Sequence, residues 1–201
     1  MRTLLVSLCW LGVLGAQTAP VALKQGERDR AMSHMHATRK MFLDSLAGVT
    51  QAQWDFKPAP EVWSIAEVAE HITLSEDMLF DLATKRALKT PPDPAMKTDP
   101  AGDEKLLAAV VDRSTKVKAP EALNPKRTFQ TMTELITEFK KRRDRNIAYV
   151  QTTEDPLRAH AAKHPVLGTL DAYQWLLLLS AHSERHTLQL NEVKQHPSFP
   201  K

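Results

Sequence analysis

Two histidines with the spacing of a helical metal site stand near the end of the chain. His182 and His186 are four residues apart in a segment rich in leucine. On a helix this spacing leaves the side chains about 40° apart around the axis and about 5–6 Å apart at Cβ. Two imidazoles placed in this way can share one metal ion at about 2.0–2.1 Å from each nitrogen. The pair therefore predicts half of a metal site.

The residues between the two histidines do not complete a zinc-protease motif. That motif has glutamate directly after the first histidine, where it acts as general base, and this chain has Ser183 at that position. Glu184 follows, but it lies about 160° round the helix from His182 and should not reach the metal. The segment predicts ligands without identifying a catalytic base, so the catalytic residues stay unknown.

A third histidine, His71, lies on a second expected helix beside its apolar stripe. Helix bundles build metal sites from inward-pointing side chains on facing helices. Three imidazoles leave coordination positions open, as in catalytic sites. The alternative is that each histidine is a hydrogen-bonded core residue. The other histidines do not have such spacing on an expected helix and are interpreted as surface or loop residues, with His164 as the reserve ligand: His34, His36, His160, His164 and His196.

The elements that must position these side chains are helices. Apolar residues recur at helical spacing in four long segments, and Ala, Leu, Glu, Lys and Arg dominate them. The expected long helices span residues 25–47, 64–88, 131–150 and 169–195. Residues 50–62 and 155–168 are expected to be loops. Residues 90–127 are expected to form a long crossover with a short helix at about 103–114.

Two sequence signals mark where helices begin. Ser64 with Glu67, and Thr131 with Glu134, have the spacing of capping boxes, in which the first side chain accepts the N–H of the third helical residue. Glu67 also lies one turn before His71 on the same face. It could therefore support or assist a metal site, but the cap is the preferred interpretation of this residue.

The composition is that of one soluble domain. The chain has 201 residues, 42% hydrophobic and 25% charged, with a net charge of +3. Such a small charge does not call for nucleic acid or an acidic membrane as partner. The basic run at residues 140–145 could suggest nucleic-acid binding, but consecutive residues spread around a helix. A solvated face with one or two ion pairs is the preferred interpretation, and no nucleic-acid partner is expected.

The first 16 residues have the features of a secretory signal peptide. Arg2 precedes an apolar run that ends at Gly15 and Ala16. The run is shorter than the roughly 20 residues that span a bilayer, although an uncleaved anchor is the alternative. Cleavage near Ala16 would export the protein, without stable membrane insertion. It would also remove Cys9, the only cysteine, and with it any disulfide or thiolate ligand.

Two motifs resemble those of the DinB/YfiT-like superfamily. Residues 63–72 (WSIAEVAEHI) are similar to its first metal motif, and residues 175–189 (WLLLLSAHSERHTLQ) to its second. Residues 54–58 (WDFKP) match the usual approach to the first motif. The resemblance extends over essentially everything after the leader, so a single domain is expected at residues 25–196.

This resemblance implies an all-α fold, a four-helix bundle in an up-down-down-up arrangement. It also implies a three-histidine metal site, carried onto His71, His182 and His186. The divalent ion would be zinc or nickel, with iron or manganese as further options. Some members dimerise, so a homodimer is one option here. Known activities include thiol S-transfer and isomerisation with small thiols, and hydrolysis is suspected. An exported member would not meet cytosolic thiols, which disfavours thiol transfer.

Two functional hypotheses follow. The first is a metal-dependent enzyme, a hydrolase or a transferase, acting on a small molecule that the sequence does not identify. The second is a non-catalytic module for metal storage or sensing. Both use the same three ligands. An open coordination position beside an apolar pocket would favour the enzyme.

Overall fold

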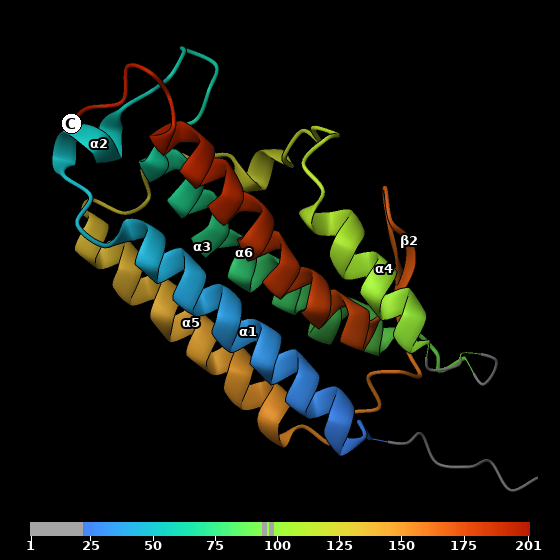
Figure 1. Cartoon of the computed structure of the whole chain (residues 1–201). Coiled ribbons are helices and arrows are strands. Elements are labelled where there is room, and N and C mark those ends of the chain that lie inside the picture. Colours follow the sequence, from blue (N-terminus) through green and yellow to red (C-terminus); the bar gives the residue numbers. More distant parts are fainter. Residues whose placement is uncertain (1–21, 94–95, 97–98) are drawn as a thin grey trace, which may run out of the picture.

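The protein is a four-helix bundle in a computed structural model that describes residues 22–201 except 94–95 and 97–98. The predicted leader, residues 1–16, lies outside the described residues. The long helices are α1 (Gln25–Leu46), α3 (Ile65–Asp81), α5 (Met132–Thr152) and α6 (Ala172–Lys194). Along the chain they run up, down, down and up (Figure 1). The expected all-α fold and its arrangement are confirmed.

Two of the helices begin where capping side chains were expected. The Ser64 hydroxyl accepts the Glu67 N–H at 3.2 Å, and Glu67 accepts the Ser64 N–H at 2.8 Å. The predicted box at α3 is therefore complete. Thr131 caps α5 by accepting the Glu134 N–H at 3.1 Å, but the Glu134 carboxylate accepts from Gln130 instead. A further box, formed by Asp171 with Gln174, opens α6.

Helix α6 is the central element of the bundle. It packs against α1, α3 and the extra helix α4 (Pro100–Val111), while α5 packs against α1 and α3. Its apolar residues are buried almost without interruption from Trp175 to Leu179. Burial of this kind on a helix contacted from several sides provides most of the hydrophobic stabilisation. The expected short helix in the crossover is confirmed as α4.

Several connections carry structure that the sequence did not predict. Residues 50–62 contain the short helix α2 (Gln51–Asp55). Helix α3 ends earlier than expected and continues as a π-helical turn, η1 (Leu82–Arg86), and a 3₁₀ turn, η2 (Ala87–Lys89). The crossover contains the turn η3 (Glu121–Leu123). These turns are too short to show a periodic apolar pattern.

The prediction that residues 155–168 form a loop is wrong. It contains an antiparallel hairpin of β1 (Ala161–His164) and β2 (Gly168–Asp171). Gly168, at φ 81°, closes the hairpin after a three-residue turn, in a conformation that suits glycine. The last helix consequently begins at Ala172 and not at residue 169. Strands of four residues, one reading Ala-Ala-Lys-His, have no alternating pattern to reveal them.

Candidate metal centre

The three predicted histidines meet between α3 and α6. One ring nitrogen from each residue lies within 4.8 Å of the corresponding nitrogens of the other two. The ring centroids of His182 and His186 are each 5.0 Å or less from that of His71. His71 is 1% exposed, and the two α6 residues are partly covered. We call these three residues the histidine cluster. Within the described residues it is the one group of three or more potential ligands placed to hold an ion.

Hydrogen bonds fix which nitrogen of two rings faces the centre of the cluster. His71 Nδ1 lies 3.0 Å from the Leu123 carbonyl oxygen, and His186 Nδ1 lies 2.8 Å from the Gln189 side-chain oxygen. Because both oxygens only accept, each Nδ1 carries the proton and each Nε2 keeps a free lone pair. Metal-binding histidines are commonly oriented in this way by an acceptor on the other nitrogen.

The distance between two of these nitrogens fits a shared ion. His71 Nε2 and His182 Nε2 lie 3.3 Å apart. Two nitrogens bound tetrahedrally at about 2.05 Å from one zinc ion are separated by about 3.3 Å. Without an ion, one of these two Nε2 atoms must carry a proton and donate it to the other, because two lone pairs at this distance would repel each other. His182 Nδ1 is buried and has no hydrogen-bond partner among the described residues.

Burial keeps the three rings neutral. It is the main cause that lowers the pKa of His71, against the opposing effect of the Leu123 bond. Burial also lowers the pKa of His186 to about 3, reinforced by His71. The pKa of His182 falls well below its usual value through burial and then through its two histidine neighbours. Neutral imidazoles have the lone pair that a metal ion requires.

The two glutamates near the first motif have different partners. Glu67 caps α3 and accepts two bonds of 2.9 Å from Lys57 Nζ, so the preferred interpretation of Glu67 is confirmed. Glu70, which the sequence analysis did not single out, is 4% exposed. Burial acts to raise the pKa of Glu70, but hydrogen bonds from Thr128 and from the backbone of residues 126–128 lower it overall.

The remaining partners of the histidine cluster were also missed. Gln189 lies three residues after His186, a spacing at which helical side chains meet, so the sequence contained a usable signal for it. The sequence contained no signal for the Leu123 carbonyl, because every residue type has a backbone acceptor. Trp63 covers one side, with its ring centroid 5.0 Å from that of His71.

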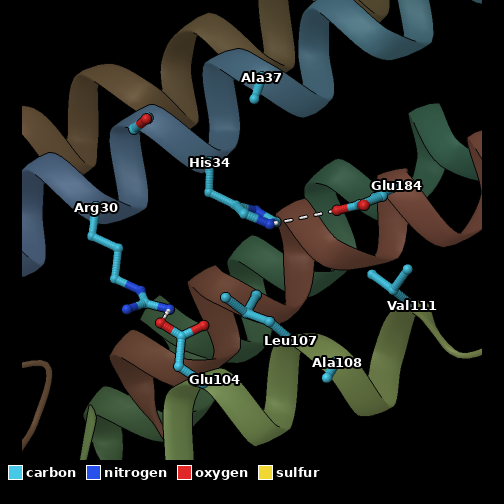
Figure 2. Close-up of a pocket in the computed structure, with 9 residues that line it drawn as sticks. Arg30, His34, Ala37, Glu104, Leu107, Ala108, Val111 and Glu184 are labelled. Carbon is cyan, nitrogen blue, oxygen red and sulfur yellow. Dashed lines mark ion pairs between the residues drawn. The ribbon is translucent and has the colours of Figure 1, made fainter. Parts of the chain in front are cut away.

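The other histidines lie apart from the cluster. His164 is on β1, not in a loop, and its ring centroid lies 5.3 Å from Trp175. His160 faces the Thr90 carbonyl, and His36 is exposed. His34 is more covered than its interpretation as a surface residue implied. It lies in a groove of about 520 Å³ between α1, α4 and α6, where it pairs with Glu184 at 3.5 Å (Figure 2).

This groove does not open onto the histidine cluster. Figure 2 shows Arg30 and His34 of α1 bridging to Glu104 of α4 and Glu184 of α6. None of the three clustered histidines lines it. As expected from its angle on the helix, Glu184 is directed to the groove and not to the cluster.

The basic run on α5 holds one residue that the sequence analysis misplaced. Arg142 and Arg145 pair with Asp77 at 3.0 and 2.9 Å, as expected for a solvated face. Arg143, in contrast, is fully buried and pairs with the equally buried Glu76 at 2.5 Å. Its partner lies 67 residues away in sequence, so the run itself did not reveal it.

The comparisons with known proteins agree with this architecture. The sequence matches the DinB superfamily over residues 34–190, and the chain belongs to this superfamily. It is 28% identical over 164 residues to the uncharacterised protein YuaE of Bacillus subtilis (strain 168), covering 82% of this chain and 97% of that one.

A solved structure with the same fold is that of YfiT from Bacillus subtilis, described as a probable metal-dependent hydrolase with an unusual four-helix bundle topology. It aligns with a TM-score of 0.57 over 93% of this chain and 97% of YfiT, at 13% sequence identity. At this identity the likeness concerns the fold. No helix within residues 22–93, 96 and 99–201 is both long and apolar enough to cross a membrane.

Proposed function

We propose that this protein binds one divalent metal ion through His71, His182 and His186 and is a metal-dependent enzyme, a hydrolase being favoured over a transferase. The observation that carries the proposal is the 3.3 Å separation of His71 Nε2 and His182 Nε2 within a cluster of neutral imidazoles, of which His71 is buried and the other two are partly covered. Zinc or nickel suits such nitrogen ligands, and iron or manganese are further options.

The chain's own residues would hold the ion and leave part of its coordination open. His71 and His186 are oriented by the Leu123 carbonyl and the Gln189 side chain. Three protein ligands match the number found in catalytic zinc sites. A bound divalent ion supplies a Lewis acid that polarises a substrate oxygen and increases the acidity of water. Glu67 is not proposed as a base, because its carboxylate is held by Ser64 and Lys57.

Hydrolysis is favoured over thiol transfer because of the proposed location. The apolar run before Ala16 supports export, and an exported protein lacks cytosolic thiol cosubstrates. Sequencing of the N-terminus of protein from the periplasm or medium tests this part. A new terminus near Gln17 supports export, whereas an intact Met1 on a cytosolic protein contradicts it.

A non-catalytic metal module is the second candidate. It is favoured by the limited access to His71, which is 1% exposed, and by the groove of Figure 2, which the histidine cluster does not line. In this case the ion would be stored or sensed without meeting a substrate.

An assay of reloaded protein separates the two candidates. Protein without an affinity tag is stripped with a chelator, reloaded with zinc or nickel, and tested on nitrophenyl esters, phosphoesters and amides. His186→Ala serves as the test variant and His36→Ala, at an exposed position, as its control. Metal-dependent hydrolysis by wild type and His36→Ala supports the enzyme. Stoichiometric metal without turnover supports the module, and equal turnover by His186→Ala contradicts catalysis at this site.

A further inference from the structure

Two adjacent residues of α3 hold the same segment of the crossover. His71 Nδ1 donates to the Leu123 carbonyl at 3.0 Å. Glu70, its neighbour, accepts the backbone N–H groups of residues 126, 127 and 128 at 3.1, 3.0 and 2.9 Å. The Thr128 hydroxyl adds a fourth bond at 2.6 Å. We call residues 123–128 the clasp segment.

The backbone of the clasp segment is shaped to surround a carboxylate. Arg127 has φ 58°, a left-handed conformation that is uncommon for a residue other than glycine. Such a turn lets consecutive N–H groups converge on one anion. A non-glycine residue held in this region requires compensating interactions, and the ionised Glu70 provides them. The segment is thus organised around the charge of Glu70.

The two attachment points are too close to move independently. Only Asn124 and Pro125 separate Leu123 from the first residue that Glu70 binds. Proline fixes its own φ and restricts the residue before it. Leu123 is 4% exposed, so its side chain is also anchored. The position of the Leu123 carbonyl is therefore coupled to the hydrogen bonds that Glu70 accepts from residues 126–128.

We propose that Glu70 is a positioning residue for the histidine cluster. By fixing the clasp segment it holds the Leu123 carbonyl against His71 Nδ1, which keeps the proton on Nδ1 and the lone pair on Nε2. Glu70 touches neither the ion nor a substrate. The role serves the proposed metal site and in that sense rests on the proposed function, but its effect on the His71 ring exists without metal.

The test compares Glu70→Gln with Glu67→Gln, which alters a glutamate one turn earlier on the same helix. The ¹⁵N shifts of the His71 ring in metal-free protein report which nitrogen carries the proton. Competition with a chromogenic chelator gives the zinc affinity. For Glu70→Gln we expect partial loss of the Nδ1–H signature and zinc binding about 10- to 100-fold weaker. For Glu67→Gln both should match wild type, even where loss of the ion pair with Lys57 lowers its stability.

A milder variant covers the case in which Glu70→Gln does not fold. Thr128→Val removes one bond and leaves the carboxylate, and it should shift both readouts in the same direction by less. Unchanged His71 shifts in the folded Glu70 variant, or in Thr128→Val where that variant alone folds, would overturn the proposal. If wild type binds no zinc but the shifts change as expected, the positioning role stands and the proposed function fails. If wild type binds zinc but neither readout changes in the variants, the proposed metal site stands and the positioning role of Glu70 fails.

Discussion

The bundle buries two polar clusters between α3 and α6, and they differ in whether the protein satisfies them. The arginine cluster joins all four long helices, because Arg143 of α5 bonds to Glu76 of α3, Ser183 of α6 and Thr38 of α1. Asn146 donates to the same Glu76 carboxylate at 3.0 Å. Every charged group there has a partner within the chain.

The histidine cluster, next to it on α6, is left incomplete. Three neutral rings converge there, with His71 Nε2 and His182 Nε2 facing each other at 3.3 Å. His182 Nδ1 has no partner among the described residues. Native proteins rarely leave buried polar groups unpaired without a reason. The difference teaches that burial alone does not mark a functional site. The arginine cluster has all its hydrogen-bond partners within the chain, which suits a structural role. The histidine cluster does not, which suits a site for a ligand.

The largest expected effect concerns the arginine cluster. Arg143→Ala leaves the Glu76 carboxylate buried without its partner, which should lower the free energy of unfolding by about 3–5 kcal/mol. Lys141→Ala, on the exposed side of the same helix, should change it by less than about 1 kcal/mol. Urea denaturation of both variants checks this. Equal losses in the two variants would remove the distinction between a structural arginine and a surface base.

Removal of metal should lower the thermal stability only when the histidine cluster is intact. A ligand at 100 to 1,000 times its Kd stabilises the native state by about 2.7–4.1 kcal/mol. Addition of a chelator to the reloaded wild type should therefore lower its thermal midpoint, while His182→Ala should not respond. A chelator-induced shift of equal size in His182→Ala would place the stabilising ion elsewhere.

The stability of the metal-free protein should depend on pH partly through the histidine cluster. The pKa of His186 is lowered to about 3, mainly by burial, against about 6.5 in the unfolded chain. Between these values the unfolded state binds a proton that the folded state does not, so stability falls as the pH falls below 6.5. For His186 the loss from pH 6.5 to 5 is roughly 2 kcal/mol.

Denaturation of metal-free wild type and His186→Ala at the two pH values measures this term. Carboxylates that titrate in both proteins cancel in the difference. The variant should lose about 2 kcal/mol less than wild type. Parallel losses would mean that His186 is readily protonated in the folded protein and is a weaker candidate ligand.

The smallest effect is expected at the Gln189 side chain. Gln189→Leu removes the acceptor of His186 Nδ1 and keeps similar bulk, so metal affinity should fall about tenfold, or about 1.4 kcal/mol. Isothermal titration with zinc would show it. Gln174→Leu is not a suitable control, because Gln174 caps α6. Gln51→Leu, at an exposed position on α2, should leave the affinity unchanged.

The sequence predicted the parts of this account that depend on side-chain pattern. Apolar periodicity located the four long helices, and the spacing of His182 and His186, with His71 on a second stripe, identified the three residues that the fold brings together. The β-hairpin was missed because its strands are only four residues long. The clasp segment was missed because its contacts use backbone groups, which residue types do not encode.

Arg143 and Glu70 show a further limit of sequence reasoning. Each is a charged residue among other charged residues, and its burial depends on a partner more than 50 residues away. A local signal existed for Arg143, which lies four residues after Phe139 and four before Ile147 on the apolar stripe of α5. Nothing local separates Glu70 from Glu67, and only the tertiary structure shows that Glu70 is the enclosed member of that pair.

The central claim, that the histidine cluster is a metal site, is tested most directly by elemental analysis. Protein purified without a metal-affinity tag is compared with His182→Ala and with His36→Ala as control. We predict about one divalent ion per chain in wild type and in His36→Ala, and none in His182→Ala. A folded wild type that stays empty after reconstitution with zinc and nickel would contradict the account and leave three buried core histidines.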